Sequence, residues 1–216
     1  MYLNASTPTV QLASATTTSF DSYNITITLT ERQRVDVVQI SGTPGGVGTN
    51  TVLRVTEHSF RDIAHNFNQQ AQDVVLVETP DTTPPVPLNA RIHYGTGVVM
   101  FNTSEILDVT PTTVLELTLL ALRNDATTTL ERDRQFGFQT SDVIDLTGST
   151  ITAYDDTRTV FQLTELQRVH ALAFSGTKGG DGTAGYFILE PNALRDVALN
   201  RNPTRYALML VEEEDR

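Results

Sequence analysis

The sequence LTERQRVDVVQISGTPGGVGT, residues 29–49, recurs as LTELQRVHALAFSGTKGGDGT at residues 163–183. Residues 1–81 align with residues 135–215 without a gap, and 26 of the 81 aligned pairs are identical. A fixed offset of this kind, here 134 residues, is typical of repeated structural units. We therefore expect the two aligned regions to fold alike.

Each copy predicts a strand that leads directly into a short helix. Apolar and polar residues alternate over residues 23–30, the period of two in which a strand buries one of its faces. A helix start follows at once, because Thr30 and Gln33 form a capping box, as Thr164 and Gln167 do in the second copy. We expect one short helix in each copy, followed by a glycine-rich loop and further strands.

Residues 82–134 occur only once. They are introduced by a proline-rich linker, in which two prolines fix φ and remove backbone donors. The linker consists of Asp81, Thr82, Thr83, Pro84 and Pro85. Strands are predicted after it at residues 86–93, 97–102 and 113–121. The sequence thus predicts that residues 1–81 are the C-terminal part of one repeat and that residues 82–216 are a complete repeat.

Three short motifs resemble those of a known family. They are the linker DTTPPV, the segment SEILDVTP at residues 104–111, and an Asp-x-Ala-x-Asn turn at residues 62–66 and 196–200. Together they resemble the bacterial-type Ig-like repeats that occur in tandem in surface-layer proteins, adhesins and other large extracellular proteins. Family turns usually carry glycine before the asparagine, where His65 and Leu199 stand in this chain.

The resemblance implies an all-β fold of Ig-like β-sandwich modules in tandem, each with one short helix between strands. The composition independently favours an all-β class, because threonine is abundant and its β-branched side chain suits half-exposed strands. An extracellular or cell-surface location also comes from the resemblance.

Charge and composition exclude several classes of function. The formal net charge is −11 and Lys178 is the only lysine, so little could neutralise a row of nucleic-acid phosphates. The chain has no cysteine, which excludes disulfides, thiolate nucleophiles and zinc–thiolate sites. No apolar stretch approaches the roughly 18 residues that cross a bilayer. We therefore expect no nucleic-acid partner and no membrane insertion, and any export signal would lie outside these residues.

No pattern in the sequence predicts catalysis. The glycine-rich loop at residues 41–49 has no lysine and precedes a strand, whereas a phosphate-binding loop opens a helix. The four histidines lack the spacing of metal ligands. We expect a protein that is not an enzyme and needs no cofactor, with the glycine-rich loops as flexible connectors.

Calcium is the one metal hypothesis that stays open. Acidic repeats of secreted proteins can stiffen their junctions with calcium held by clustered carboxylate oxygens. The candidate ligands are Asp62, Glu78, Asp81, Asp196 and Glu212–Asp215. The alternative is that these acids are solvated or cap turns, which the absence of a DxDxD-like cluster favours.

Three sequons could accept N-linked glycans. They lie at Asn4, Asn24 and Asn102. Chance alone would produce sequons in a chain this rich in threonine and serine, so their number carries little weight. Position says more, because Asn24 lies on the polar face of its predicted strand.

Two functional hypotheses follow. The first is a structural protein, in which Ig-like modules stack head-to-tail with copies of themselves or with adjacent repeats to form a stalk, adhesin or filament. The alternative is a non-catalytic binding module for a carbohydrate or protein ligand, attached to a larger secreted protein. A sugar-binding face would need exposed aromatic residues, and the chain has no tryptophan and six tyrosines.

The unequal copies raise one further expectation. Residues 1–81 lack the strands that residues 82–134 give the second repeat, so they should expose strand edges and part of a core. The missing strands could come from an upstream part of a longer array or from a neighbouring molecule.

Overall fold

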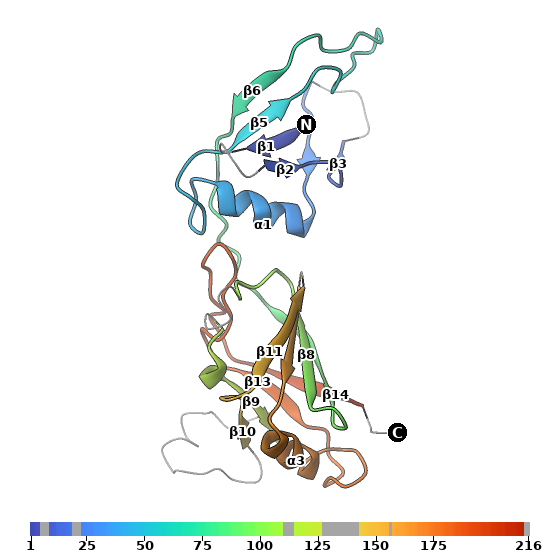
Figure 1. Ribbon diagram of the computed structural model, residues 1–216, viewed down its shortest axis with the longest axis vertical. Coiled ribbons are helices and arrows are strands. Elements are labelled where there is room, and N and C mark those ends of the chain that lie inside the picture. The colour runs from blue at the N-terminus through green and yellow to red at the C-terminus, as the bar shows by residue number, and fades with distance from the viewer. Residues whose placement is uncertain (5–8, 19–22, 110–114, 127–142, 156, 214–216) are drawn as a thin grey trace. The chain divides into compact units, whose positions relative to one another are not determined.

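The computed structural model describes residues 1–216 except 5–8, 19–22, 110–114, 127–142, 156 and 214–216. The described chain is mostly β and divides into two compact units (Figure 1). Unit 1 comprises residues 1–83 and 197–199, and unit 2 comprises residues 84–196 and 200–216. In the described part, no helix is long and apolar enough to cross a membrane.

Unit 1 contains a four-stranded sheet, a two-stranded sheet and one helix. The larger sheet has the order β2-β1-β5-β6, and all its pairs are antiparallel. The strands are β1 (Tyr2–Asn4), β2 (Thr9–Gln11), β5 (Val52–Val55) and β6 (Gln72–Val75), while β3 (Thr16–Thr17) and β4 (Ile27–Thr28) form the smaller sheet. Helix α1 (Glu31–Ile40) packs beside the larger sheet (Figure 1).

Unit 2 contains an eight-stranded sheet with the order β10-β9-β13-β14-β7-β8-β12-β11. Its elements are β7 (Pro87–His93), β8 (Val98–Thr103), the 3-10 helix η2 (Leu117–Leu119), β9 (Leu120–Arg123), β10 (Val143–Asp145), β11 (Thr150–Asp155), β12 (Arg158–Gln162), α3 (Glu165–Ala173), β13 (Tyr186–Leu189) and β14 (Tyr206–Glu213). All pairs are antiparallel except β14 with β7, which is parallel. Strand β7 is the first strand of this unit and β14 the last.

The two units differ in how well they bury apolar side chains. The core of unit 2 centres on three rings: Phe101 lies 5.6 Å from Phe161 and 5.2 Å from Phe187, measured between ring centroids. All three are fully buried. Among the described residues, the corresponding cluster of unit 1 has Leu3, Val10 and Ile40 as its buried members. The apolar core of unit 1 is therefore less completely buried than that of unit 2.

Both predicted helices are confirmed, and both begin with the predicted capping box. Thr30 accepts a hydrogen bond from the Gln33 backbone, and the Gln33 side chain accepts one from the Thr30 backbone. Thr164 and Gln167 make the same two bonds. The capping side chains satisfy N–H groups that the first turn leaves unpaired, which explains why both helices begin at the residue after the threonine.

The glycine-rich loops have a defined fold. Ser41 Oγ donates to the carbonyl of Val38, and the Gly48 N–H donates to the carbonyl of Ser41. Ser175 and Gly182 repeat this arrangement. A Cβ at Gly46 would lie 2.3 Å from the Ser41 carbonyl oxygen, so only glycine fits there. The loops thus end their helices through specific hydrogen bonds, a role that the prediction of flexible connectors omitted.

The gapless alignment is wrong for the first residues of the chain. Leu3 pairs with Val10 and Leu53, and Leu122 pairs with Ile144 and Phe187, which are their equivalents 134 residues later. Strand β1 therefore takes the place of β9, at an offset of 119 residues rather than 134. The sequence contains the sign of this change, because the first identical pair of the gapless alignment is Leu12 with Leu146.

The strand predicted at residues 113–121 is also wrong in its extent. Residues 110–114 lie outside the described part, residues 117–119 form the 3-10 helix η2, and β9 begins only at Leu120. The alternating leucines that suggested a strand include Leu117 and Leu119, which pack against the core from η2. A pattern this short does not distinguish a single 3-10 turn from a strand, because three residues are too few to reveal the period.

The Asp-x-Ala-x-Asn turns form without the glycine of the family pattern. Asp62 accepts hydrogen bonds from the backbone and side chain of Asn66, at 2.8 and 3.0 Å. Asp196 and Asn200 do the same at 2.8 and 2.9 Å. The residues before these asparagines, His65 and Leu199, take φ of 69° and 73°. This left-handed conformation explains why glycine is favoured there.

Candidate functional site

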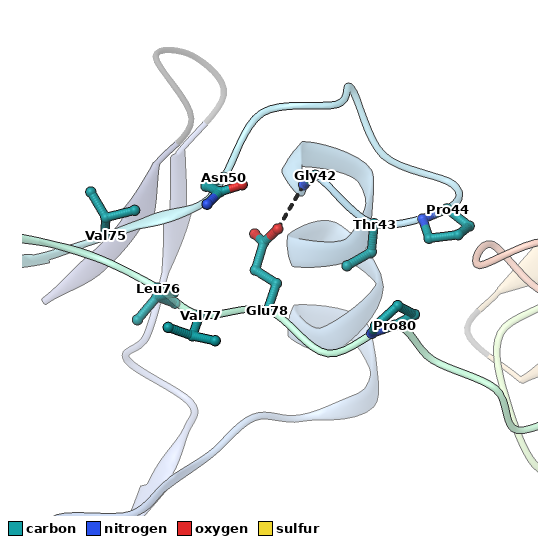
Figure 2. Close-up of a pocket in the computed structure, with 9 residues that line it drawn as sticks. All are labelled: Gly42, Thr43, Pro44, Asn50, Val75, Leu76, Val77, Glu78 and Pro80. Carbon is teal, nitrogen blue, oxygen red and sulfur yellow. Dashed lines mark hydrogen bonds between the residues drawn. The ribbon is translucent and has the colours of Figure 1, made fainter.

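Glu78 lies at an open edge of unit 1, just beyond the end of β6. Its carboxylate accepts hydrogen bonds from the N–H groups of Gly42 and Thr51, both at 2.8 Å. A cavity of about 470 Å³ lies beside it, lined by the end of β6, by the segment that follows β6 and by the loop that follows α1. Figure 2 shows Glu78 reaching from one wall of this cavity to Gly42 on the other.

The pKa of Glu78 is lowered. Partial burial alone would raise the pKa, but the hydrogen bonds from Thr51 and Gly42 outweigh that effect. The carboxyl group is therefore an anion at neutral pH. It is an acceptor at which a further donor could bind.

Unit 2 uses the equivalent glutamate to hold its first hairpin. Glu212 accepts hydrogen bonds from the N–H groups of Gly176 and Gly185, at 2.8 and 3.0 Å, which repeats the contacts of Glu78. In addition, the hydroxyl of Tyr94 donates to Glu212 at 2.6 Å. Tyr94 follows β7, at the turn into β8. Glu212 thus joins the last strand, the glycine-rich loop and the β7–β8 hairpin.

The pKa of Tyr94 is strongly raised. Burial is the main cause, and the hydrogen bond to the Glu212 carboxylate and its negative charge add to it. Tyr94 is only 2% exposed. It therefore stays a neutral donor across the physiological range of pH.

An arginine on each helix provides a second contact point. Arg168 pairs with Glu165 on its own helix and donates to the backbone carbonyl of Tyr94 at 2.9 Å. Arg34 pairs with Glu31 in the same way, and it also donates a hydrogen bond to the carboxylate of Asp81. In unit 1, therefore, Arg34 binds a carboxylate of the linker, whereas the equivalent Arg168 of unit 2 binds the β7–β8 hairpin.

The backbone edge next to Glu78 is exposed. The N–H of Leu76 donates to the carbonyl of Thr51 on the β5 side, and the N–H of Leu210 donates to Gly185 in the same way. Because successive N–H groups of an extended chain point to opposite sides, Val77 points its N–H away from β5. In unit 2 that side is occupied, since residues 210–213 pair with residues 90–93 of β7.

Several apolar side chains of unit 1 are less buried than their equivalents in unit 2. Ile27, Leu53 and Phe60 are half-buried, whereas their equivalents Phe161, Phe187 and Leu194 are fully buried. Val74 is 45% exposed. Unit 1 thus keeps apolar residues at these core positions, but the described part of the unit buries them less completely.

The predicted glycosylation sites lie in different surroundings. Asn24 is exposed, whereas Asn102 lies half-buried in β8 and donates to Asn89 at 2.8 Å. Asn4 belongs to β1, a strand that is paired on both sides. Asn24 is the sequon whose surroundings best suit a glycan, and glycosylation itself stays a prediction.

The predicted linker begins with an ordered residue. Asp81 bonds to Arg34 and also accepts from the N–H of Thr83, at 2.9 Å. Thr82 follows Asp81, and the division between the units falls between Thr83 and Pro84, with Pro85 next in the chain.

The acids proposed as calcium ligands all accept hydrogen bonds where the structure describes them. Asp62 and Asp196 cap turns, Glu78 and Glu212 hold loops, and Glu213 pairs with Arg91 at 3.2 Å. Residues 214–216 lie outside the described part. Calcium binding by these acids stays a hypothesis.

The described contacts hold the fold together and offer acceptor and edge groups, and the sequence did not predict this use of Glu78, Tyr94 or Arg34. The signal that could have found two of them is their repetition, since Glu78 and Arg34 are identical to Glu212 and Arg168. Comparison of the chain with protein-family models, with curated proteins and with solved structures found no match.

Proposed function

We propose that this chain is a structural protein whose Ig-like β-sandwich modules stand in tandem and bear load in an extracellular stalk, adhesin or filament, without enzymatic activity. Modules would stack head-to-tail with adjacent repeats. The capping boxes, the glutamates that bind the glycine-rich loops (Glu78 and Glu212) and the Asp–Asn turns occur in both units at the same offset. This repetition supports a repeated module.

The observation that carries the load-bearing proposal is the pairing of the first and last strands of unit 2. Leu210–Glu213 of β14 run parallel to Ala90–His93 of β7. A force along the chain pulls the start of β7 and the end of β14, which lie at opposite ends of this parallel pair. The hydrogen bonds between the strands are then loaded together in shear rather than opened one after another.

Force spectroscopy on single molecules tests this directly. We expect unit 2, held at its two ends, to resist extension and then to unfold in one step that releases about 450 Å of chain, at roughly 3.4 Å per residue. The matched control attaches the handle through Thr96→Cys, in the turn between β7 and β8, while keeping the C-terminal handle. The chain has no other cysteine, so this attachment is unique.

The control pulls β7 and β14 from the same end, so their bonds should open one at a time. We expect a rupture force at least twofold lower than in the end-to-end geometry. Equal forces in the two geometries would contradict the load-bearing role. Antibodies against the chain should label intact cells of the source, and labelling only after permeabilisation would contradict the extracellular location.

A further inference from the structure

Unit 1 has two open strand edges where unit 2 has a hairpin. In unit 2, β7 pairs with residues 210–213 of β14, and β8 pairs with β12. The equivalent edges of unit 1 are residues 76–79 and the side of β4 that faces away from β3. Within the described part of unit 1, no strand pairs with either edge. In unit 2 the place between the equivalent edges is filled by two strands, β7 and β8.

The backbone at residues 76–79 has the same orientation as the backbone of β14 that pairs with β7. Leu76 directs its N–H to β5, as Leu210 does, which leaves the N–H of Val77 on the open side. An added strand that is parallel to residues 76–79 would find the same sequence of donors and acceptors that β7 finds beside β14.

The side chains at the gap match this role. Glu78 repeats the two loop contacts of Glu212, and an open cavity borders its carboxylate, which is the equivalent of the group that Tyr94 contacts in unit 2. The half-buried Ile27 and Leu53 are the equivalents of Phe161 and Phe187, which pack against Phe101 of β8 in unit 2.

We propose that unit 1 is a receptor for a β-hairpin of the β7–β8 kind that is carried by another module of the array. The inference rests on the tandem arrangement proposed above. The first strand of the hairpin pairs parallel to residues 76–79, its second strand pairs with β4, and a tyrosine at its turn donates to Glu78. This is binding by strand addition, with register fixed by the apolar alternation of the hairpin.

The hairpin of a second copy of this chain is a poor donor. Ala90, Ile92, Tyr94, Val99 and Phe101 are all fully or almost fully buried in the core of unit 2. Moving this hairpin to another molecule would open one core in order to close another. A donor whose hairpin is not already packed in its own module avoids that loss.

The experiment uses the full chain and a synthetic peptide of residues 82–105 as the hairpin probe. Binding is measured by fluorescence anisotropy of the labelled peptide, and its location by hydrogen exchange of the chain. We expect binding that saturates at one peptide per chain and protects amides of residues 72–79 and 24–28, without a change at residues 210–213.

Matched variants test the register. Val77→Pro removes the N–H on the open side, where proline is tolerated at an edge, and should weaken peptide binding at least tenfold. Val77→Ala keeps that N–H, and because Val77 is fully exposed it should bind as the parent chain does. A peptide with Ile92→Asp should not bind, and one with Tyr94→Phe should bind several-fold more weakly.

Each other outcome overturns the proposal. Absence of binding, or binding that Val77→Pro leaves unchanged, would show that the edge is not a receptor. Protection of residues 72–79 that rises with chain concentration without peptide would identify a second copy as the occupant. Force resistance of unit 2 does not depend on this edge, so failure here would leave the proposed structural function to be decided by its own test.

Discussion

Tyr94 connects the first hairpin of unit 2 to its last strand through one hydrogen bond to a carboxylate. Its hydroxyl lies 2.6 Å from Glu212, and the residue is buried in the core cluster of unit 2. A hydrogen bond to a charged group contributes about 1.5–3 kcal/mol, more than one between neutral groups. Removal of the Tyr94 hydroxyl should therefore weaken the attachment of the β7–β8 hairpin to β14.

We predict that unit 2 loses stability as the pH rises above about 10. The pKa of Tyr94 is raised in the folded protein, while in the unfolded chain tyrosine ionises near its ordinary value of about 10. Ionisation above that pH therefore favours the unfolded state, and the stabilisation is complete only below it. Urea unfolding of the parent chain and of Tyr94→Phe between pH 8 and 11 measures this.

Tyr94→Phe should be less stable by about 2 kcal/mol at pH 8, because Glu212 loses a donor. Its free energy of unfolding should fall less steeply above pH 10 than that of the parent. Parallel curves for the two proteins would mean that Tyr94 ionises normally in the fold. Tyr206→Phe serves as a control at a partly exposed tyrosine.

At the scale of elements, the capping glutamine does more than begin a helix. Gln167 Oε1 accepts from the Thr164 backbone at 2.8 Å and from Ser149 at 3.0 Å. Its Nε2 donates to the carbonyls of Asp145 and Thr147, at 2.8 and 3.1 Å. The side chain thus ties α3 to β10 and the turn after it. Gln33 makes the corresponding bond to Gln11 in unit 1, at 2.8 Å.

We predict that Gln167→Glu destabilises unit 2 by about 2 kcal/mol at neutral pH. Glutamate preserves the capping acceptors, but its carboxylate cannot donate and would face two carbonyl oxygens. Below about pH 4 the protonated carboxyl regains a donor, so the deficit should shrink. Urea unfolding at pH 7 and pH 4 checks both points.

Thr164→Ser is the matched control, because it keeps the capping hydroxyl and should change stability by less than about 0.5 kcal/mol. A Gln167→Glu protein that is as stable as the parent at pH 7 would show that only the acceptor oxygen matters. That result would limit the glutamine to the ordinary capping role.

At the scale of the whole molecule, the two units should unfold separately, with unit 1 first. Unit 2 has the three fully buried phenylalanines of its core, whereas the described core cluster of unit 1 has Leu3, Val10 and Ile40 as its buried members, and Val74 is 45% exposed. Burial of apolar area is the main source of stability, at roughly 25 cal/mol per Å². Local stability should therefore be lower in unit 1.

Hydrogen exchange along a urea titration measures this difference. Amides of β6 should exchange at least about tenfold faster than those of β14, corresponding to roughly 1.4 kcal/mol or more. Phe187→Ala in the core of unit 2 should lower the midpoint of the second transition and leave the first unchanged. A single transition in which β6 and β14 are lost together would contradict independent units.

How far the sequence predicts this molecule depends on the range of the interactions. The capping boxes at Thr30 and Thr164 and the Asp–Asn turns are local, because their partners lie within four residues, so their patterns identify them. The β1 offset was missed because the place of Leu3 in the sheet depends on its pairing with Leu53, which is far away in the chain. The start of β9 was missed because the alternating leucines of η2 have the sequence pattern of a strand.

The sequence by itself determined that a strand, a capped helix, a glycine-rich loop and an Asp–Asn turn occur twice, because each rests on contacts between near neighbours. Only the tertiary structure decided that Glu212 meets Tyr94 across 118 residues and that β14 lies parallel to β7. Strand order and the direction of pairing depend on which edges can bury an apolar face together, and no local pattern encodes that choice. The open edge at Glu78 became visible only once its equivalent at Glu212 was seen filled.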